Sequence, residues 1–175
     1  SRFNNAGILV DVNNSAVTVD GNVDMDVYGN GVTVTGANST VTITKGGSIT
    51  VPTGTKYGYY TLAAYEGTIN MNMGTNGKTV GENDVKLDGD IFALEGATIN
   101  LGLATADSHI KGIIDNGGTV NLTLKNGATW TNEAQNQRSE LDNKVICSDG
   151  RSVVTKLTGG TSIEDAGNII QTANS

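Results

Sequence analysis

The segment Gly118-Thr119-Val120-Asn121-Leu122-Thr123-Leu124-Lys125-Asn126-Gly127 alternates polar and apolar side chains before it ends in a glycine turn. Val120, Leu122 and Leu124 are separated by single polar residues, and a period of two places such side chains on one face of a β-strand. The pair Asn126-Gly127 is typical of a tight turn. The segment therefore predicts a short strand with one apolar face, closed by a turn.

The same letters occur twice earlier in the chain, as Gly67-Thr68-Ile69-Asn70-Met71 and as Ala97-Thr98-Ile99-Asn100-Leu101. Counting from Thr40, the threonines that start these motifs (Thr40, Thr68, Thr98 and Thr119) are 28, 30 and 21 positions apart. Repeats spaced by about 20–50 residues are typical of stacked architectures. Stacking would place alike apolar residues on one another and would let the repeated Asn side chains hydrogen-bond between neighbouring repeats.

The composition favours β structure over helix. The 175 residues include 24 Gly, 23 Thr and 20 Asn, a mixture that suits strands and turns. Charged residues make up 17%, against about 25% in an average protein, while 37% hydrophobic residues suffice for a core. We therefore expect residues 1–175 to form a single all-β domain.

Two β architectures fit this pattern. In a right-handed, single-stranded parallel β-helix, each strand pairs with the equivalent strand of the next coil, about 4.8 Å away. The alternative is an antiparallel β-sandwich, because residues 25–34 resemble a hairpin with an Asn30-Gly31 turn. The repeated motif favours the β-helix, with about eight coils at about 20 residues each. Residues 131–150, which are rich in charge, are predicted to leave the coil as a loop excursion.

Charge and cysteine content exclude several classes of function. The net charge of −7 and the scattered Lys and Arg residues argue against nucleic-acid binding. A single cysteine, Cys147, permits no intramolecular disulfide, and with only one histidine the chain cannot build a Cys/His zinc site. We expect no cofactor.

The sequence has neither a membrane-spanning apolar run nor a secretory signal at Ser1–Asn5. Because it starts without Met, we expect an excised or processed piece of a longer protein.

Three segments carry a resemblance to a known family: residues 87–91, residues 118–131 and residues 153–160. They resemble the passenger region of autotransporters, the pertactin-like parallel β-helices that Gram-negative bacteria export. The resemblance is strongest over residues 85–160. It implies a non-enzymatic stalk and adhesin, located outside the cell on the outer membrane or released from it. It also implies that the protein meets the membrane only through a C-terminal barrel that this sequence does not include.

The candidate adhesion surface consists of Lys56, Tyr57, Tyr59, Tyr60, Tyr65 and Arg138. The tyrosines are the one concentrated group of aromatic residues, and tyrosine rings can stack on sugars or anchor a protein interface. A host surface protein or glycan is the expected partner, and the loops around residues 56–65 and 131–150 are expected to bind it. The alternative is that these rings cover one end of the core or seal a loop. Since a stacked coil leaves unpaired strands at both ends, end-to-end self-association is also expected.

The sequence supports an enzymatic function less well than an adhesive one. Asp107-Ser108-His109 contains the letters of a hydrolase triad, but consecutive residues of a strand point to alternate faces. The pairs Asp24/Asp26 and Asp88/Asp90 could hold Ca²⁺ only if further ligands converged on them. The enzyme alternative is a truncated polysaccharide lyase, for which Arg138 and Arg151 would be the basic candidates. We expect no catalytic or metal site.

Overall fold

The computed structural model describes residues 5–54, 58–135, 140–141, 144–145 and 152–172. These residues form strands and connecting turns without a helix, so none of them lies in a helix that could cross a membrane. Sheet A contains β1 (Ala6–Val10), β4 (Asn30–Val34), β7 (Tyr60–Ala64), β10 (Asp90–Ala93) and β13 (Ile114–Asn116). Sheet B contains β2 (Ala16–Val19), β5 (Thr40–Ile43), β8 (Thr68–Met71), β11 (Thr98–Leu103), β14 (Thr119–Leu124) and β18 (Lys156–Thr158). Sheet C contains β3 (Val23–Asp26), β6 (Gly47–Thr50), β9 (Val85–Asp88), β12 (His109–Lys111), β15 (Thr129–Asn132) and β19 (Asn168–Gln171).

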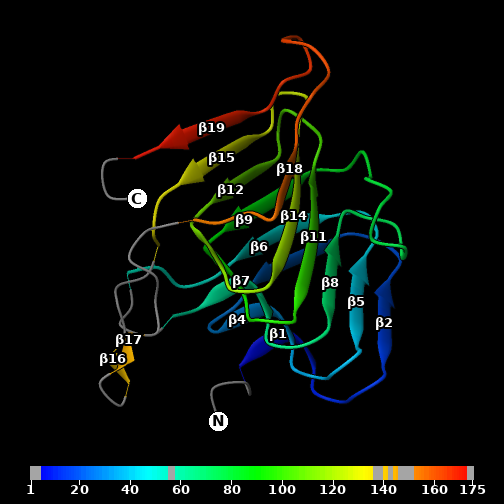
Figure 1. Cartoon of the computed structure of the whole chain (residues 1–175), viewed down its shortest axis with the longest axis vertical. Helices are drawn as coiled ribbons and strands as arrows, with labels where there is room; N and C mark the ends of the chain where they lie inside the picture. The colour runs from blue at the N-terminus through cyan, green and yellow to red at the C-terminus, as the bar shows by residue number, and fades with distance from the viewer. Residues whose placement is uncertain (1–4, 55–57, 136–139, 142–143, 146–151, 173–175) are drawn as a thin grey trace.

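The chain visits the three sheets in turn, and we call each visit to A, B and C one circuit. From β1 to β12, each strand pairs in parallel with the strand three places later, so the first five circuits lie one against the next (Figure 1). The pairs β14–β18 and β15–β19 continue this order after the short antiparallel pair β16 (Glu140–Leu141) and β17 (Lys144–Val145). The predicted all-β, parallel arrangement is confirmed.

The sandwich alternative is wrong, and so is the hairpin at residues 25–34. β3 lies in sheet C beside β6, whereas β4 lies in sheet A between β1 and β7. The backbone N–H of Asn30 donates to the carbonyl of Asn5, and that of Val27 donates to the carbonyl of Thr50. Both sides of the Asn30 corner therefore bond to other circuits and not to each other.

The repeated motif sets the register of sheet B. Thr40 pairs with Thr68, Thr68 with Thr98, and Thr98 with Thr119, as the repeat predicts. Two apolar columns follow from this register, Val41–Ile69–Ile99–Val120 and Ile43–Met71–Leu101–Leu122, and every member is at most 1% exposed.

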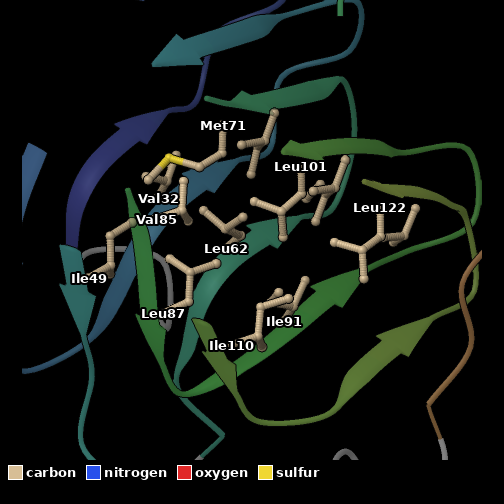
Figure 2. Packing of buried hydrophobic residues seen from close by; sticks show 14 of the residues in the cluster. Val32, Ile49, Leu62, Met71, Val85, Leu87, Ile91, Leu101, Ile110 and Leu122 are labelled. Carbon is tan, nitrogen blue, oxygen red and sulfur yellow. The ribbon is translucent and has the colours of Figure 1, made fainter. Parts of the chain in front are cut away.

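The core fills the space between the three sheets. Val32, Leu62 and Ile91 from sheet A and Ile49, Leu87 and Ile110 from sheet C point toward the columns of sheet B (Figure 2). Trp130 extends the sheet C column, and its indole N–H donates to the carbonyl of Gly112 at 2.9 Å. Burying each such side chain contributes about 1.5–3 kcal/mol.

The expectation of about eight coils is wrong. No sheet of the described chain holds more than six strands, because most circuits are longer than the expected coil. Ile110 and its partner Trp130 are 20 residues apart, but Ile49 and Leu87 are 38 apart, and Trp130 and Ile169 are 39 apart. The extra residues lie at corners between sheets, where the chain can lengthen without moving a strand.

Within the described part of the chain, both ends of the stack are open. There β2 and β3 pair on one side only, as do β18 and β19 at the other end. Apolar side chains remain exposed there, among them Val17 (38%) and Leu157 (46%).

Candidate binding surfaces

Three aromatic rings form a row on the face of sheet A that points away from the core. Phe92 of β10 lies opposite Ala63 of β7. Its ring centroid is 5.1 Å from that of Tyr60 and 5.2 Å from that of Tyr65, so Phe92 is the middle ring. Phe92 and Tyr65 are half-buried, whereas Tyr60 is only 5% exposed. Tyr60 is therefore the buried ring that packs against Phe92, and Phe92 and Tyr65 are the rings of this row that a ligand can reach.

A second pair of rings precedes this row. Tyr28 and Tyr59 lie with their ring centroids 6.0 Å apart at corners that lead into sheet A. Tyr28 is 78% exposed, while Tyr59 is half-buried and packs against the core cluster.

The predicted tyrosines thus have two ring partners that the sequence analysis missed. Phe92 and Tyr28 lie about 30 residues from them along the chain, and only the pairing of successive circuits brings them near. Of the other predicted site residues, Lys56, Tyr57 and Arg138 lie outside the described residues. The adhesive role of Tyr59, Tyr60 and Tyr65 stays a prediction. We call the four accessible rings, Tyr28, Tyr59, Tyr65 and Phe92, the aromatic face.

Asp90 ties the excursion after β15 to this side of the molecule. Its buried carboxylate accepts hydrogen bonds from the backbone N–H groups of Ile113 at 2.9 Å and Gln135 at 3.1 Å. The carbonyl of Gln135 in turn accepts a hydrogen bond from the backbone N–H of Gly54 at 2.7 Å. The two segments predicted to carry recognition, residues 56–65 and 131–150, therefore start from neighbouring points.

The acidic pair Asp88/Asp90 is divided between two environments. Between them Gly89, with φ of +144°, turns the chain from β9 to β10. The half-exposed carboxylate of Asp88 lies 3.1 Å from Nε2 of His109, whereas Asp90 is buried among backbone donors. Within the described part of the chain, no three His, Cys, Asp or Glu side chains group as metal ligands would.

Ser108 and His109 also separate. Ser108 is 1% exposed, and its hydroxyl accepts a hydrogen bond from the backbone N–H of Val85 at 3.0 Å. His109 lies on the outer face of sheet C beside Asp88. The serine therefore fastens one circuit to the next, and the histidine is not its base. Arg138 and Arg151, the basic candidates of the lyase hypothesis, lie outside the described residues.

A row of amides follows the outer face of sheet B. Nδ2 of Asn121 donates to Oδ1 of Asn100, and Nδ2 of Asn100 donates to Oδ1 of Asn70, both at 2.8 Å. Nδ2 of Asn70 continues the row to the hydroxyl of Thr42 at 3.1 Å. The hydrogen bonds expected between repeated Asn side chains are present, and we call this set the amide row.

Comparison of the chain with protein-family models, with curated proteins and with solved structures finds no match. Its function is therefore inferred from its own residues.

Proposed function

We propose that the chain is a right-handed, single-stranded parallel β-helix that acts outside a bacterial cell as a stalk and adhesin, as autotransporter passengers do. It would be displayed on the outer membrane, through a barrel that follows it, or be released. The three parallel sheets and the stacking of Thr40, Thr68, Thr98 and Thr119 support the β-helix. The motifs of residues 118–131 and 153–160 support the family.

The observation that carries the adhesin proposal is the contact between Gly54 and Gln135. It joins Gly54, which precedes the tyrosines, to Gln135, which follows β15, and Gln135 also bonds to Asp90, the partner of Tyr60 in sheet A. Loops held on a rigid scaffold are common recognition elements. Half-exposed rings add the apolar contact area that sugars and protein partners use. We infer that a host glycan or surface protein binds across this side.

A binding screen against glycans and matrix proteins tests the proposal, with Tyr59→Ala and Tyr65→Ala as variants. Loss of an anchoring ring should weaken binding by about tenfold, as expected for a contact worth about 1.4 kcal/mol. Ile163→Ala is the matched control, because Ile163 is 88% exposed in a loop near the C-terminal end of the stack and should not affect binding.

The same samples can be assayed for cleavage of acidic polysaccharides. Turnover without binding to any partner would contradict the adhesin proposal and support the lyase alternative. Binding that is unchanged in both tyrosine variants would refute the placement of the site on the aromatic face.

A further inference from the structure

A groove of about 420 Å³ lies on the outer face of sheet B, beside the amide row. Its polar lining comes from Lys78, Asn100, Asn121, Thr123, Lys156 and Thr158. These residues belong to the turn after β8 and to β11, β14 and β18. The groove and the aromatic face therefore lie on different sheets.

The loop that follows β8 decides how much of the amide row is accessible. Gly77 passes so close to the row that a Cβ atom there would lie 2.7 Å from Nδ2 of Asn100 and 2.9 Å from Oδ1 of Asn70. The loop is held in place by Asn72, whose Nδ2 donates to the carbonyls of Gly81 and Gly102 at 3.0 Å. Asn70 is 2% exposed and Asn100 8%, while Asn121 is half-exposed. The row thus emerges from under the loop into the groove.

The amide row also has a direction. Every Nδ2 donates toward the earlier circuit, so the last carbonyl oxygen, Oδ1 of Asn121, faces the later one. The residue paired with Asn121 on β18 is Lys156, which interrupts the run of Asn. Among the described residues, nothing donates a hydrogen bond to Oδ1 of Asn121. The groove therefore contains one open amide acceptor next to a lysine.

The charge of the groove is opposite to that of the whole chain. Its lining contains two lysines and no carboxylate, although the chain carries a net charge of −7. A second groove, on sheet C, has Lys45 and Lys86, but Asp24, Glu82 and Asp84 also line it. An anion is thus attracted to the sheet B groove more than to the sheet C groove.

We propose that the sheet B groove binds an acidic oligosaccharide, a chain of sugars that bear carboxylates. Lys78 and Lys156 pair with the carboxylates, since ammonium groups and carboxylates form charge-assisted hydrogen bonds. A sugar hydroxyl donates to Oδ1 of Asn121, and the hydroxyls of Thr123 and Thr158 bond to others. A polyanion of much higher charge density is disfavoured by the negative charge of the rest of the molecule.

Calorimetric titration of the full chain tests the proposal, with oligogalacturonate and its fully methyl-esterified form as probes. The two share a backbone and differ only in carboxylate charge. The acid form should bind and the ester should bind at least about tenfold more weakly, with the affinity of the acid form falling as salt is added. Equal binding of both forms, or no binding of the acid form, would overturn the proposal.

Variants locate the site. Lys78→Gln and Lys156→Gln should each lower affinity by about threefold to tenfold, whereas Lys45→Gln and Lys86→Gln, in the sheet C groove, should leave it unchanged. Thr123→Asp adds a carboxylate to the groove floor and should abolish binding. Thr129→Asp, at a half-buried outward position of sheet C, is its control. Equal losses in the two sets would show non-specific attraction and refute the site.

Since this groove and the aromatic face use separate residues, failure here leaves the tyrosine variants to decide the adhesin proposal independently.

Discussion

Replacing Asn100 by alanine removes the middle of the amide row and should destabilise the whole stack. Asn100 joins two circuits, because it donates to Asn70 and accepts from Asn121, both at 2.8 Å. Alanine keeps the strand and its inward neighbours Ile99 and Leu101, so the loss is confined to the two hydrogen bonds.

The two bonds differ in what replaces them. Asn70 is 2% exposed, and leaving a buried acceptor unpaired costs about 1–3 kcal/mol. Asn121 is half-exposed and can turn to water, so the net loss there is about 0.5–1.5 kcal/mol. We expect Asn100→Ala to lower the free energy of unfolding by about 1.5–4.5 kcal/mol in total.

Urea unfolding followed by circular dichroism measures this loss, provided that the slope against urea is unchanged. Thr98→Ala is the matched control. Thr98 lies on the same strand, faces outward and is half-buried, and its hydroxyl bonds to no described residue, so the change should be within about 0.5 kcal/mol. Similar losses in the two variants, or a loss below about 1 kcal/mol for Asn100→Ala, would refute the role of the amide row.

Asn100→Asp keeps the shape of the side chain but, when ionised, removes its hydrogen-bond donor. The ionised carboxylate would face Oδ1 of Asn70, acceptor against acceptor, which should raise the pKa of the new carboxyl above its ordinary value of about 3.9. A raised folded-state pKa means that the variant regains stability below about pH 4 and loses it as the pH rises through the folded pKa. The deficit relative to the unmodified chain should therefore be smaller at pH 3 than at pH 7. A deficit independent of pH would contradict this reasoning.

Three further outcomes follow from the structure. Gly67→Ala should cost about 2–5 kcal/mol in urea unfolding, because its φ is +70° and a Cβ would collide with the carbonyl oxygens of Ser39 and Gly36. Gly96→Ala, with φ of +87° and open space around the new Cβ, should cost only about 1–2 kcal/mol, and equal costs would contradict the close approach at Gly67. The open ends should make the chain associate end to end at millimolar concentration, which sedimentation measures. Leu157→Lys, at the last strand of sheet B, should prevent this association, whereas Leu94→Lys, away from the ends, should not. A monomer at all concentrations would refute the expectation. Hydrogen bonds from the backbone N–H groups of Thr161 and Ser162 lower the pKa of Asp165 to about 2. The carboxylate should therefore stabilise this turn above about pH 4 and lose its hydrogen bonds as the pH falls through about 2. An NMR titration measures this midpoint, and a value near 4 would contradict the hydrogen bonds.

The register of sheet B could be predicted from the sequence because its repeats mark the same point of each circuit. Thr68, Thr98 and Thr119 stack because the apolar residues that follow each of them occupy equivalent positions in the core. The length of the circuits could not be predicted. Corner residues contribute no inward column, so their number follows no apolar pattern.

The hairpin predicted at residues 25–34 was wrong for a related reason. Alternation identifies a strand and its buried face, but both parallel and antiparallel partners satisfy it. Similarly, the tyrosines could be found as a cluster in sequence, whereas Phe92 could not be joined to them without the pairing of β7 with β10. The sheet B groove was missed because it depends on which Asn the loop at Gly77 leaves uncovered.

The unequal circuits have a consequence for how such a chain can change over time. Paired residues are 20 apart in one circuit and 39 apart in another, and their strands keep the same alignment. Added sequence at a corner therefore lengthens the surface loop without changing the sheets. A peptide inserted between Thr53 and Gly54, both exposed, should leave the strands in place, whereas a single residue inserted within β11 would turn the later side chains of that strand to the opposite face. The corners are thus the natural places for new specificities to arise by insertion, and for foreign epitopes to be grafted.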